Sequence, residues 1–377
     1  MRALIGSGGT LIALWLAGCS SSATPQASAG SGIGGSAAGS SGAVSSTGTP
    51  SSTGARGSAS AGSSPPPSSA DRFPASSIIY QDVSGATPDP SSAQIINHLQ
   101  AAGGWGGSGI FQIDFSITIL HADSTVVPRP FTQPAGYYSP DCDVTTVPIP
   151  AGGNAEGSTD YACDASQNDC HVLVYQGTRL YELYNTNITG GQATGNPFTT
   201  LCEVVWDLTH DYWQSVPAGM QYSRGDQCTS ADAAGMPIAP LLVTGAELQA
   251  GVVPHALRFI LPNADIRKGV YVHPGTHVGG PTGDDLMPPY AAHFRLKSTF
   301  DASGLTPAAR AVAVALQKYG MFLDDGGNIP LTFDASAASQ IGSHDLASIK
   351  VTDFDFIASP DPIVTATDNC TRTPLTR

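Results

Sequence analysis

The chain has 377 residues, with 16 lysine and arginine residues against 30 aspartate and glutamate residues, and a formal net charge of −14. Because nucleic-acid binding depends on cations that face phosphates, this balance argues against nucleic acid as a partner. The length is sufficient for a tether and one large domain, and no stretch after residue 76 is long and apolar enough to cross a membrane as a helix.

The N-terminus predicts export. Residues 1–18 combine a basic start at Arg2, a short apolar stretch and small residues, the pattern of a secretory signal peptide. The sequence Leu-Ala-Gly-Cys that ends at Cys19 resembles the lipobox of bacterial lipoproteins. The resemblance implies that Cys19 is acylated, which would anchor the chain to a membrane through lipid. In the lipoproteins that the sequence resembles, a serine in the next position, here Ser20, favours the outer membrane, so the resemblance implies an outer-membrane or cell-surface location.

A tether is expected to follow the anchor. Residues 19–75 consist almost entirely of serine, glycine, alanine, threonine and proline. Such a composition cannot bury enough apolar surface to offset the entropy lost on ordering. We therefore expect a disordered spacer, and a folded extracytoplasmic domain over residues 76–377.

Strands dominate the predicted domain. The segment 110–120 alternates apolar and polar residues, which is typical of a strand with one buried face. Residues 171–184 read as a hairpin around a short glycine-containing loop. Further strands are expected at 201–208, 255–261, 270–273 and 292–300.

Helices are predicted to be few. Apolar spacing indicates helices over 92–102 and 307–322, the second capped by Thr306. Thr244 and Glu247 have the spacing of a capping box that opens a short helix. Many strands with few helices predict a mainly β fold, as a single β-sandwich of jelly-roll type with peripheral helices.

Six cysteines remain after Cys19, and an even number in an exported domain predicts three disulfides. Fifteen pairings are possible. Cys163 and Cys170 are close enough in sequence to pair, and Cys370 is expected to tie the C-terminal tail to the body. A zinc site is the alternative, but the sequence has no CxxC spacing to support it. The six expected disulfide cysteines are Cys142, Cys163, Cys170, Cys202, Cys228 and Cys370.

Several runs in the second half of the chain resemble an uncharacterised family of secreted bacterial proteins. The shared segments are TSADAAG from Thr229, HALRF from His255 and KYGM from Lys318. The resemblance implies no activity and no catalytic residue. The chain departs from the family at 272–274, which read Val-His-Pro where a Trp–Pro pair is usual.

Three carboxylates are the leading catalytic candidates, because glycoside hydrolysis commonly uses a pair of them as acid and base or nucleophile. Asp114 lies on the polar face of its strand, Glu182 stands among aromatic residues, and Asp232 follows Ser230. Each carboxylate also has a possible structural role without catalysis. Asp114 and Glu182 could lie on solvated strand faces, and Asp232 could lie at the positive end of a helical turn. His255, at the start of a strand, is the fourth catalytic candidate.

A second group of residues is predicted to bind substrate. His293, Arg295 and Lys297 share one face of a strand, which is either a solvated face or a site for a uronate carboxylate. Tyr181 offers a ring for sugar stacking, and His277 stands in a glycine- and proline-containing loop. His273 and His277 are four residues apart, but Pro274 denies them the helix that would make this spacing a metal signal.

These features predict a surface-displayed lipoprotein that hydrolyses extracellular polysaccharide, without a metal or other cofactor. Two alternatives remain open. A histidine or tyrosine beside the basic row would suit a polysaccharide lyase acting on uronates, and the aromatic residues would suit a non-catalytic carbohydrate-binding or adhesive lipoprotein. The sequence contains no phosphate-binding loop and no GxSxG nucleophile motif.

Overall fold

A computed structural model describes residues 71–213, 224–367 and 369–377. The predicted signal peptide, Cys19 and nearly all of the predicted tether lie outside the described residues. Within them, strand residues (23%) outnumber helical residues (18%) and no sheet closes into a barrel, so the predicted mainly β class is confirmed. The described helices include none that is both long enough and apolar enough to span a membrane.

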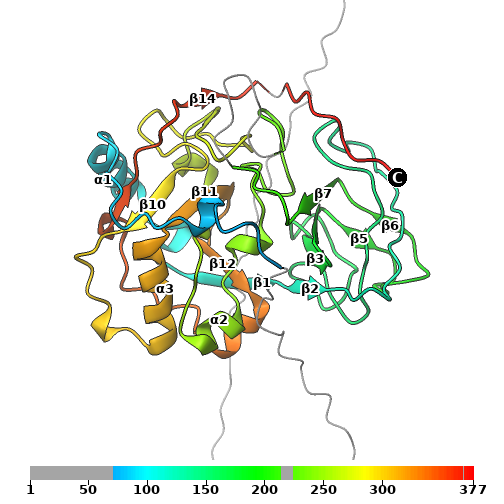
Figure 1. The fold of residues 1–377 in the computed structure, drawn as a ribbon. Coiled ribbons are helices and arrows are strands. Elements are labelled where there is room, and N and C mark those ends of the chain that lie inside the picture. Colours follow the sequence, from blue (N-terminus) through cyan, green and yellow to red (C-terminus); the bar gives the residue numbers. More distant parts are fainter. Residues whose placement is uncertain (1–70, 214–223, 368) are drawn as a thin grey trace, which may run out of the picture.

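Two sheets contain most of the described strands (Figure 1). The larger has six strands in the order β1-β12-β8-β11-β10-β13, with β1/β12 and β8/β11 parallel. The smaller has four in the order β2-β3-β4-β7, with β2/β3 parallel. The strands are β1 (Ile113–Ile117), β2 (Ile119–His121), β3 (Val172–Gln176), β4 (Arg179–Tyr184), β7 (Cys202–Asp207), β8 (Leu257–Leu261), β10 (His293–Leu296), β11 (Met321–Gly326), β12 (Leu331–Asp334) and β13 (Phe354–Phe356). Two minor ribbons pair β5 (Asn187–Ile188) with β6 (Phe198–Thr199) and β9 (Val270–Tyr271) with β14 (Val364–Thr365).

The chain passes from the larger sheet to the smaller one between β1 and β2. The single strand expected over 110–120 is therefore wrong: it is interrupted at Thr118, and its two halves belong to different sheets. Asp334 fixes the second half, because its Oδ2 accepts the backbone N–H of Ile119 at 2.7 Å. Figure 1 shows β1 and β2 joining the two parts of the molecule.

Three α-helices lie beside the six-stranded sheet: α1 (Ser92–Ala102), α2 (Gly245–Ala250) and α3 (Pro307–Lys318). The expected cap of α3 is present, since Thr306 accepts the N–H of Ala309. Helix α1 has the predicted bounds. The expected extension of α3 to residue 322 is wrong. Gly320 adopts a left-handed φ of 70°, which ends the helical path and starts β11. Short 3₁₀ turns occur at Ile78–Tyr80, Gly106–Ser108, Ala239–Leu241, Asn263–Asp265, Ala302–Gly304, Ala335–Ser339 and Val351–Asp353.

The predicted capping box opens α2. Thr244 Oγ1 accepts the N–H of Glu247, and Glu247 Oε2 accepts the N–H of Thr244 at 3.0 Å. Replacing Thr244 by alanine is expected to lower the free energy of unfolding by about 1 kcal/mol, because a backbone donor loses its partner. Urea unfolding checks this, with Thr178→Ala in an exposed turn as the control. Equal midpoints for the two variants would contradict the assignment.

Both faces of the four-stranded sheet are buried. Side chains on one face, such as Leu173 and Val204, join the main hydrophobic core, whereas their neighbours Val172 and Val205 join a smaller core under the loops. Glu182 pairs in register with Leu173 and Val204 and therefore points towards the main core. The period-two pattern thus directs one carboxylate into the main hydrophobic core.

Three disulfides are present, as predicted: Cys142–Cys202, Cys163–Cys170 and Cys228–Cys370. The expected short pair is confirmed. Cys370 ties the C-terminal segment to the body through Cys228, as the sequence suggested.

The first buried side chain of the described residues is Phe73. It is 3% exposed and packs edge-on against Trp206, Tyr212 and Trp213, with ring centroids 5.0–6.1 Å apart. Because aromatic pairs of this geometry contribute beyond the area they bury, Phe73 fastens the N-terminal end of the domain.

Candidate functional site

Arg258 on β8 is the centre of a buried charged cluster. Its side chain is 4% exposed, and Nη2 lies 2.5 Å from Asp232 Oδ2 and 3.8 Å from Asp325 Oδ2. Its Nη1 donates to Thr332 Oγ1 on the neighbouring strand β12 at 3.3 Å. A cation buried this deeply is stable only when anions compensate for its lost hydration.

Two adjacent aspartates at the end of β11 face this cation. A shift in the β8/β11 register falls between Leu323 and Asp325. Asp324 is fully buried, and neither of its carboxylate oxygens has a hydrogen-bond partner among the described residues. Burial, followed by the charge of Asp232, raises the pKa of Asp324 well above its ordinary value. The same two causes raise the pKa of Asp325 to about 7, although its side chain is 24% exposed.

Glu156 and His171 form an ion pair at the edge of the cluster. His171 Nδ1 lies 2.7 Å from Glu156 Oε2, and Nε2 lies 2.9 Å from the carbonyl oxygen of Ala231. Because both ring nitrogens face acceptors, the ring is an imidazolium. Burial lowers the pKa of His171, but Glu156 more than offsets this and the pKa is about 9. Burial in turn raises the pKa of Glu156, but the charge and hydrogen bonds of His171 hold it below its ordinary value.

Asp114 on β1 joins this pair through a serine. Ser116 Oγ donates to Asp114 Oδ2 and lies 3.2 Å from Glu156 Oε1. Burial, with a contribution from Glu156, raises the pKa of Asp114. Asp114 is also in register with Thr332, whose hydroxyl Arg258 binds. We call the following residues the Arg258 cluster: Asp114, Glu156, His171, Asp232, Arg258, Asp324 and Asp325.

Glu182 is a neighbour of this cluster with a different character. It has no exposed surface, and Trp206 Nε1, the N–H of Ile238 and the N–H of Ala239 each donate to it at 2.8 Å. Burial raises its pKa to about 7. With its oxygens occupied and no route to solvent, Glu182 holds the turn at 238–239 in place.

Two further candidates lie at different distances from the cluster. His277 is half-buried, and its Nδ1 lies 3.0 Å from the carbonyl oxygen of Ala233, the residue after Asp232. Tyr181 is 5% exposed and points into the smaller core, on the face of β4 opposite Glu182. The structure therefore brings His277 to the edge of the cluster and directs Tyr181 away from it.

The predicted basic row lies elsewhere. His293 stacks on Phe322, and burial lowers its pKa to about 4. Arg295 lies within hydrogen-bonding distance of the carbonyl oxygens of residues 83, 84 and 86, and Lys297 donates to the carbonyl oxygen of Thr352. These contacts fasten neighbouring segments to β10, and none of them involves the Arg258 cluster.

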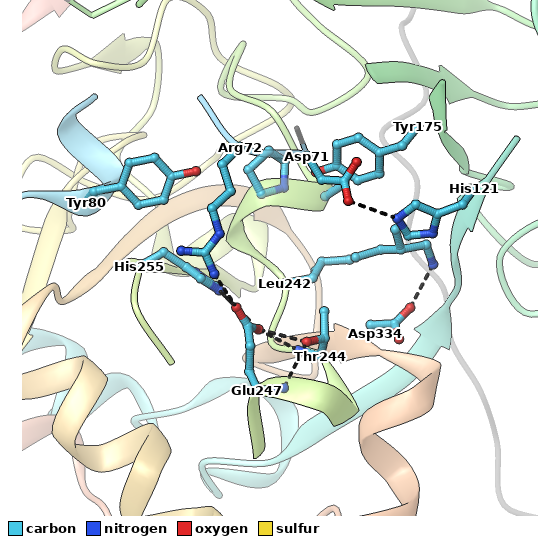
Figure 2. A pocket seen from close by; sticks show the side chains of 13 residues that line it. Asp71, Arg72, Tyr80, His121, Tyr175, Leu242, Thr244, Glu247, His255 and Asp334 are labelled. Atoms are coloured by element: carbon cyan, nitrogen blue, oxygen red, sulfur yellow. Dashed lines mark hydrogen bonds and ion pairs between the residues drawn. The ribbon is translucent and has the colours of Figure 1, made fainter. Parts of the chain in front are cut away.

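His255 lines a separate cavity of about 50 Å³ (Figure 2). Its Nε2 lies 3.3 Å from Glu247 Oε1, and its Nδ1 lies 2.7 Å from the carbonyl oxygen of Ala256. The cavity walls come from Asp71, Arg72, Tyr80, Ile119, His121, Tyr175, Ala239, Pro240, Leu242, Thr244, Glu247, His255 and Asp334.

Over the described ranges, a single group of side chains has metal-ligand proximity: Asp141, Cys228 and Cys370. The two cysteines are joined in a disulfide and offer no thiolate, so this group has only one ordinary metal ligand.

No family model matches the chain, and neither a curated protein nor a solved structure matches it. Its function is therefore argued from the side chains that the fold brings together. Of the four catalytic candidates, Asp114 and Asp232 belong to the Arg258 cluster, Glu182 lies beside it and His255 lies in another cavity. Sequence reasoning missed Glu156, His171, Arg258 and the two aspartates of β11. The HALRF and LDDGG runs contain three of these five, but no spacing within them marks a shared site.

Proposed function

We propose that the domain hydrolyses extracellular polysaccharide by acid–base catalysis at the Arg258 cluster. The observation that carries the proposal is a pair of partly exposed carboxyl groups with opposite pKa shifts beside one buried arginine. Asp325 is 24% exposed with a pKa of about 7, and Glu156 is 15% exposed with a lowered pKa. Carboxyl groups whose environments separate their pKa values are the usual acid and base of a glycoside hydrolase.

The roles follow from the two protonation states. At neutral pH a large fraction of Asp325 still holds its proton and can donate it to the oxygen of the glycosidic bond as that bond breaks. Glu156 is ionised and can attack the sugar carbon or take a proton from the attacking water. His171 keeps Glu156 ionised through its positive charge.

Other members of the cluster act as positioning residues. Asp232 holds the guanidinium of Arg258, and this guanidinium lies 3.8 Å from the proposed acid. Ser116 Oγ lies between Asp114 and the second oxygen of Glu156 and can share its one proton with these two carboxyl groups. Glu182, which lies beside the cluster, fixes the backbone turn at 238–239 by accepting its N–H groups.

The proposal includes the setting predicted from the sequence. An acyl group on Cys19 would hold the chain at the outer membrane, and the part of the predicted tether that precedes Asp71 would let the domain reach polysaccharide outside it. The proposed architecture is a sandwich-like stack of the two main sheets with the cluster between them. Main-core contacts from one face of the four-stranded sheet support this arrangement; the parallel pairs β1/β12, β8/β11 and β2/β3 differ from the antiparallel pairing of a jelly roll.

Asp325→Asn and Glu156→Gln are each expected to reduce hydrolysis at least about 100-fold, because each removes a group that transfers a proton or attacks the sugar. The measurement is release of reducing sugar from a panel of neutral and acidic polysaccharides by the mature chain. Asp285→Asn is the matched control, since the Asp285 side chain is 92% exposed and lies outside the cluster.

The assay separates the alternatives. Reducing sugar without new ultraviolet absorbance supports hydrolysis, whereas absorbance from unsaturated uronates would replace it with a lyase. Retention of a polysaccharide without any turnover would replace it with a carbohydrate-binding lipoprotein. Full activity in both cluster variants would overturn the assigned roles.

A further inference from the structure

The cavity of Figure 2 has no part in the proposed hydrolysis. Its polar lining comes from the start of the described chain, the 3₁₀ turn at 78–80, β2, β3 and α2. It encloses about 50 Å³. Because one water occupies roughly 10–15 Å³ on this measure, the enclosed space holds a group of about four non-hydrogen atoms. This is the size of a carboxylate group with the carbon that bears it.

The carboxylates in the cavity wall are already paired. Glu247 Oε2 accepts the N–H and Oγ1–H of Thr244 at 3.0 Å each, and Oε1 faces His255. Asp334 accepts the N–H of Ile119 on one oxygen and the N–H of Ser336 on the other. Asp71 Oδ2 faces His121 Nε2 at 3.6 Å. The wall therefore has little acceptor capacity left for a ligand.

Donors in the wall are engaged less fully. Arg72 has five N–H groups, and among the described residues its side chain makes one ion pair, with Glu247 Oε1, at a loose 3.5 Å. Its side chain is 33% exposed and can turn without leaving a buried charge. Figure 2 shows the Tyr80 hydroxyl pointing towards the Arg72 side chain. Burial raises the pKa of Tyr80 to about 12, so this hydroxyl remains a donor at neutral pH.

His255 adds a second positive charge at the same end of the cavity. Both of its ring nitrogens face acceptors, the carbonyl oxygen of Ala256 and the carboxylate of Glu247, so the ring is an imidazolium. Arg72 and His255 together carry two positive charges against the single negative charge of Glu247, while the other two carboxylates of the wall, Asp71 and Asp334, face His121 and the N–H of Ile119. This end of the cavity therefore favours an anion.

We propose that the cavity binds a carboxylate group, carried either by a small organic acid or by a uronic acid unit, through the Arg72 guanidinium and the Tyr80 hydroxyl. The planar fork of arginine matches the two oxygens of a carboxylate, and charge-assisted bonds of this kind are stronger than neutral ones. The inference goes beyond the proposed hydrolysis and does not depend on it, because it concerns binding at a separate cavity.

Isothermal titration calorimetry of the mature chain tests the inference with glucuronate, glucose and propionate. Glucuronate is expected to bind at least about tenfold more tightly than glucose, which lacks the carboxylate. Arg72→Gln is expected to weaken glucuronate binding at least about tenfold, and Arg72→Lys less, since lysine keeps the charge but not the fork. Arg179→Gln, at an exposed strand end, is the matched control and should leave the affinity unchanged.

Each outcome has a defined meaning. Propionate binding as tightly as glucuronate supports a free acid as the ligand, and tighter glucuronate binding supports a uronic acid unit. Tyr80→Phe removes one hydroxyl without opening a cavity and should weaken glucuronate binding, so it tests the site even if Arg72 variants unfold. Equal affinity for glucose and glucuronate, no heat with glucuronate, or full affinity in a folded Arg72→Gln variant would overturn the proposal. A chain that binds glucuronate but hydrolyses nothing would retain it while losing the proposed function.

Discussion

Replacing Arg258 by methionine is expected to lower the free energy of unfolding by about 3–5 kcal/mol at pH 7. The substitution leaves Asp232, which has 1% exposure, without the guanidinium that lies 2.5 Å from it, and it removes the nearest cation from Asp325. An uncompensated buried anion is among the most destabilising defects in a core. Urea unfolding at pH 7 measures the effect.

The control is Arg267→Met, because Arg267 is paired with Asp285, whose side chain is 92% exposed. Its expected cost is below about 1 kcal/mol. Adding Asp232→Asn to Arg258→Met should restore part of the lost stability, since the second change removes the orphaned charge. If the Arg258 and Arg267 variants lose equal stability, the buried ion pairs of the cluster do not contribute as described.

Unfolding is also expected to need more urea at pH 5 than at pH 9. Among the groups whose pKa values are raised in the folded chain, His171 has a pKa of about 9, and Glu182, Glu203 and Asp325 have pKa values of about 7. Between pH 5 and 9 these four groups bind more protons in the folded state than in the unfolded state. His293, with a pKa lowered to about 4, acts in the opposite direction below about pH 6.5, but it is one group against three carboxyl groups. Since the slope of unfolding free energy against pH follows the protons of the unfolded state minus those of the folded state, stability falls as pH rises.

The two kinds of group act in different parts of this range. The carboxyl groups lose their stabilising protonated form as pH rises towards and through 7, whereas His171 loses its contribution between about 6.5 and 9. A shift from 6.5 to about 9 corresponds to roughly 3 kcal/mol for His171. Glu156 has a lowered pKa, so its contribution is lost only as pH falls below its ordinary value of 4.5.

A series of urea midpoints from pH 5 to pH 9 checks the prediction, with His171→Asn as the comparison. This variant should lose the decline between pH 6.5 and 9 and keep the decline at lower pH. A flat midpoint across the whole range in the parent chain would show that the raised pKa values do not describe the folded state.

Local sequence patterns were sufficient to predict most of the secondary structure. The cap residues Thr244 and Thr306 and the alternation in the hairpin at 171–184 act within a few residues, so the sequence shows them directly. The interruption at Thr118 could not be foreseen, because the Asp334 carboxylate that fixes Ile119 lies 215 residues away. The parallel pairing of β1 with β12 is likewise a long-range choice that periodicity does not encode.

The candidate site was predictable only in part, for the same reason. Asp114 and Asp232 could be proposed because carboxylates are common acids and bases. Arg258 lies 26 positions from Asp232 in a predicted strand, and no local pattern indicates that the two side chains meet. The basic row on β10 also has contacts that its local pattern does not predict. Alternation placed His293 and Arg295 on one face, but it could not reveal that β11 and β13 flank that strand and that neighbouring carbonyls bind both side chains.

The packing of Phe73 has a mechanical consequence for a chain held by its N-terminal end. If Cys19 anchors the chain as proposed, a drag force on the domain would reach the fold near this ring, and its partner Trp206 donates a hydrogen bond to Glu182. Glu182 in turn holds the backbone at 238–239. Under the proposed lipid anchor, these three contacts would connect the anchored end of the chain to residues beside the Arg258 cluster. Trp206 would then link mechanical load on the anchor to the proposed site.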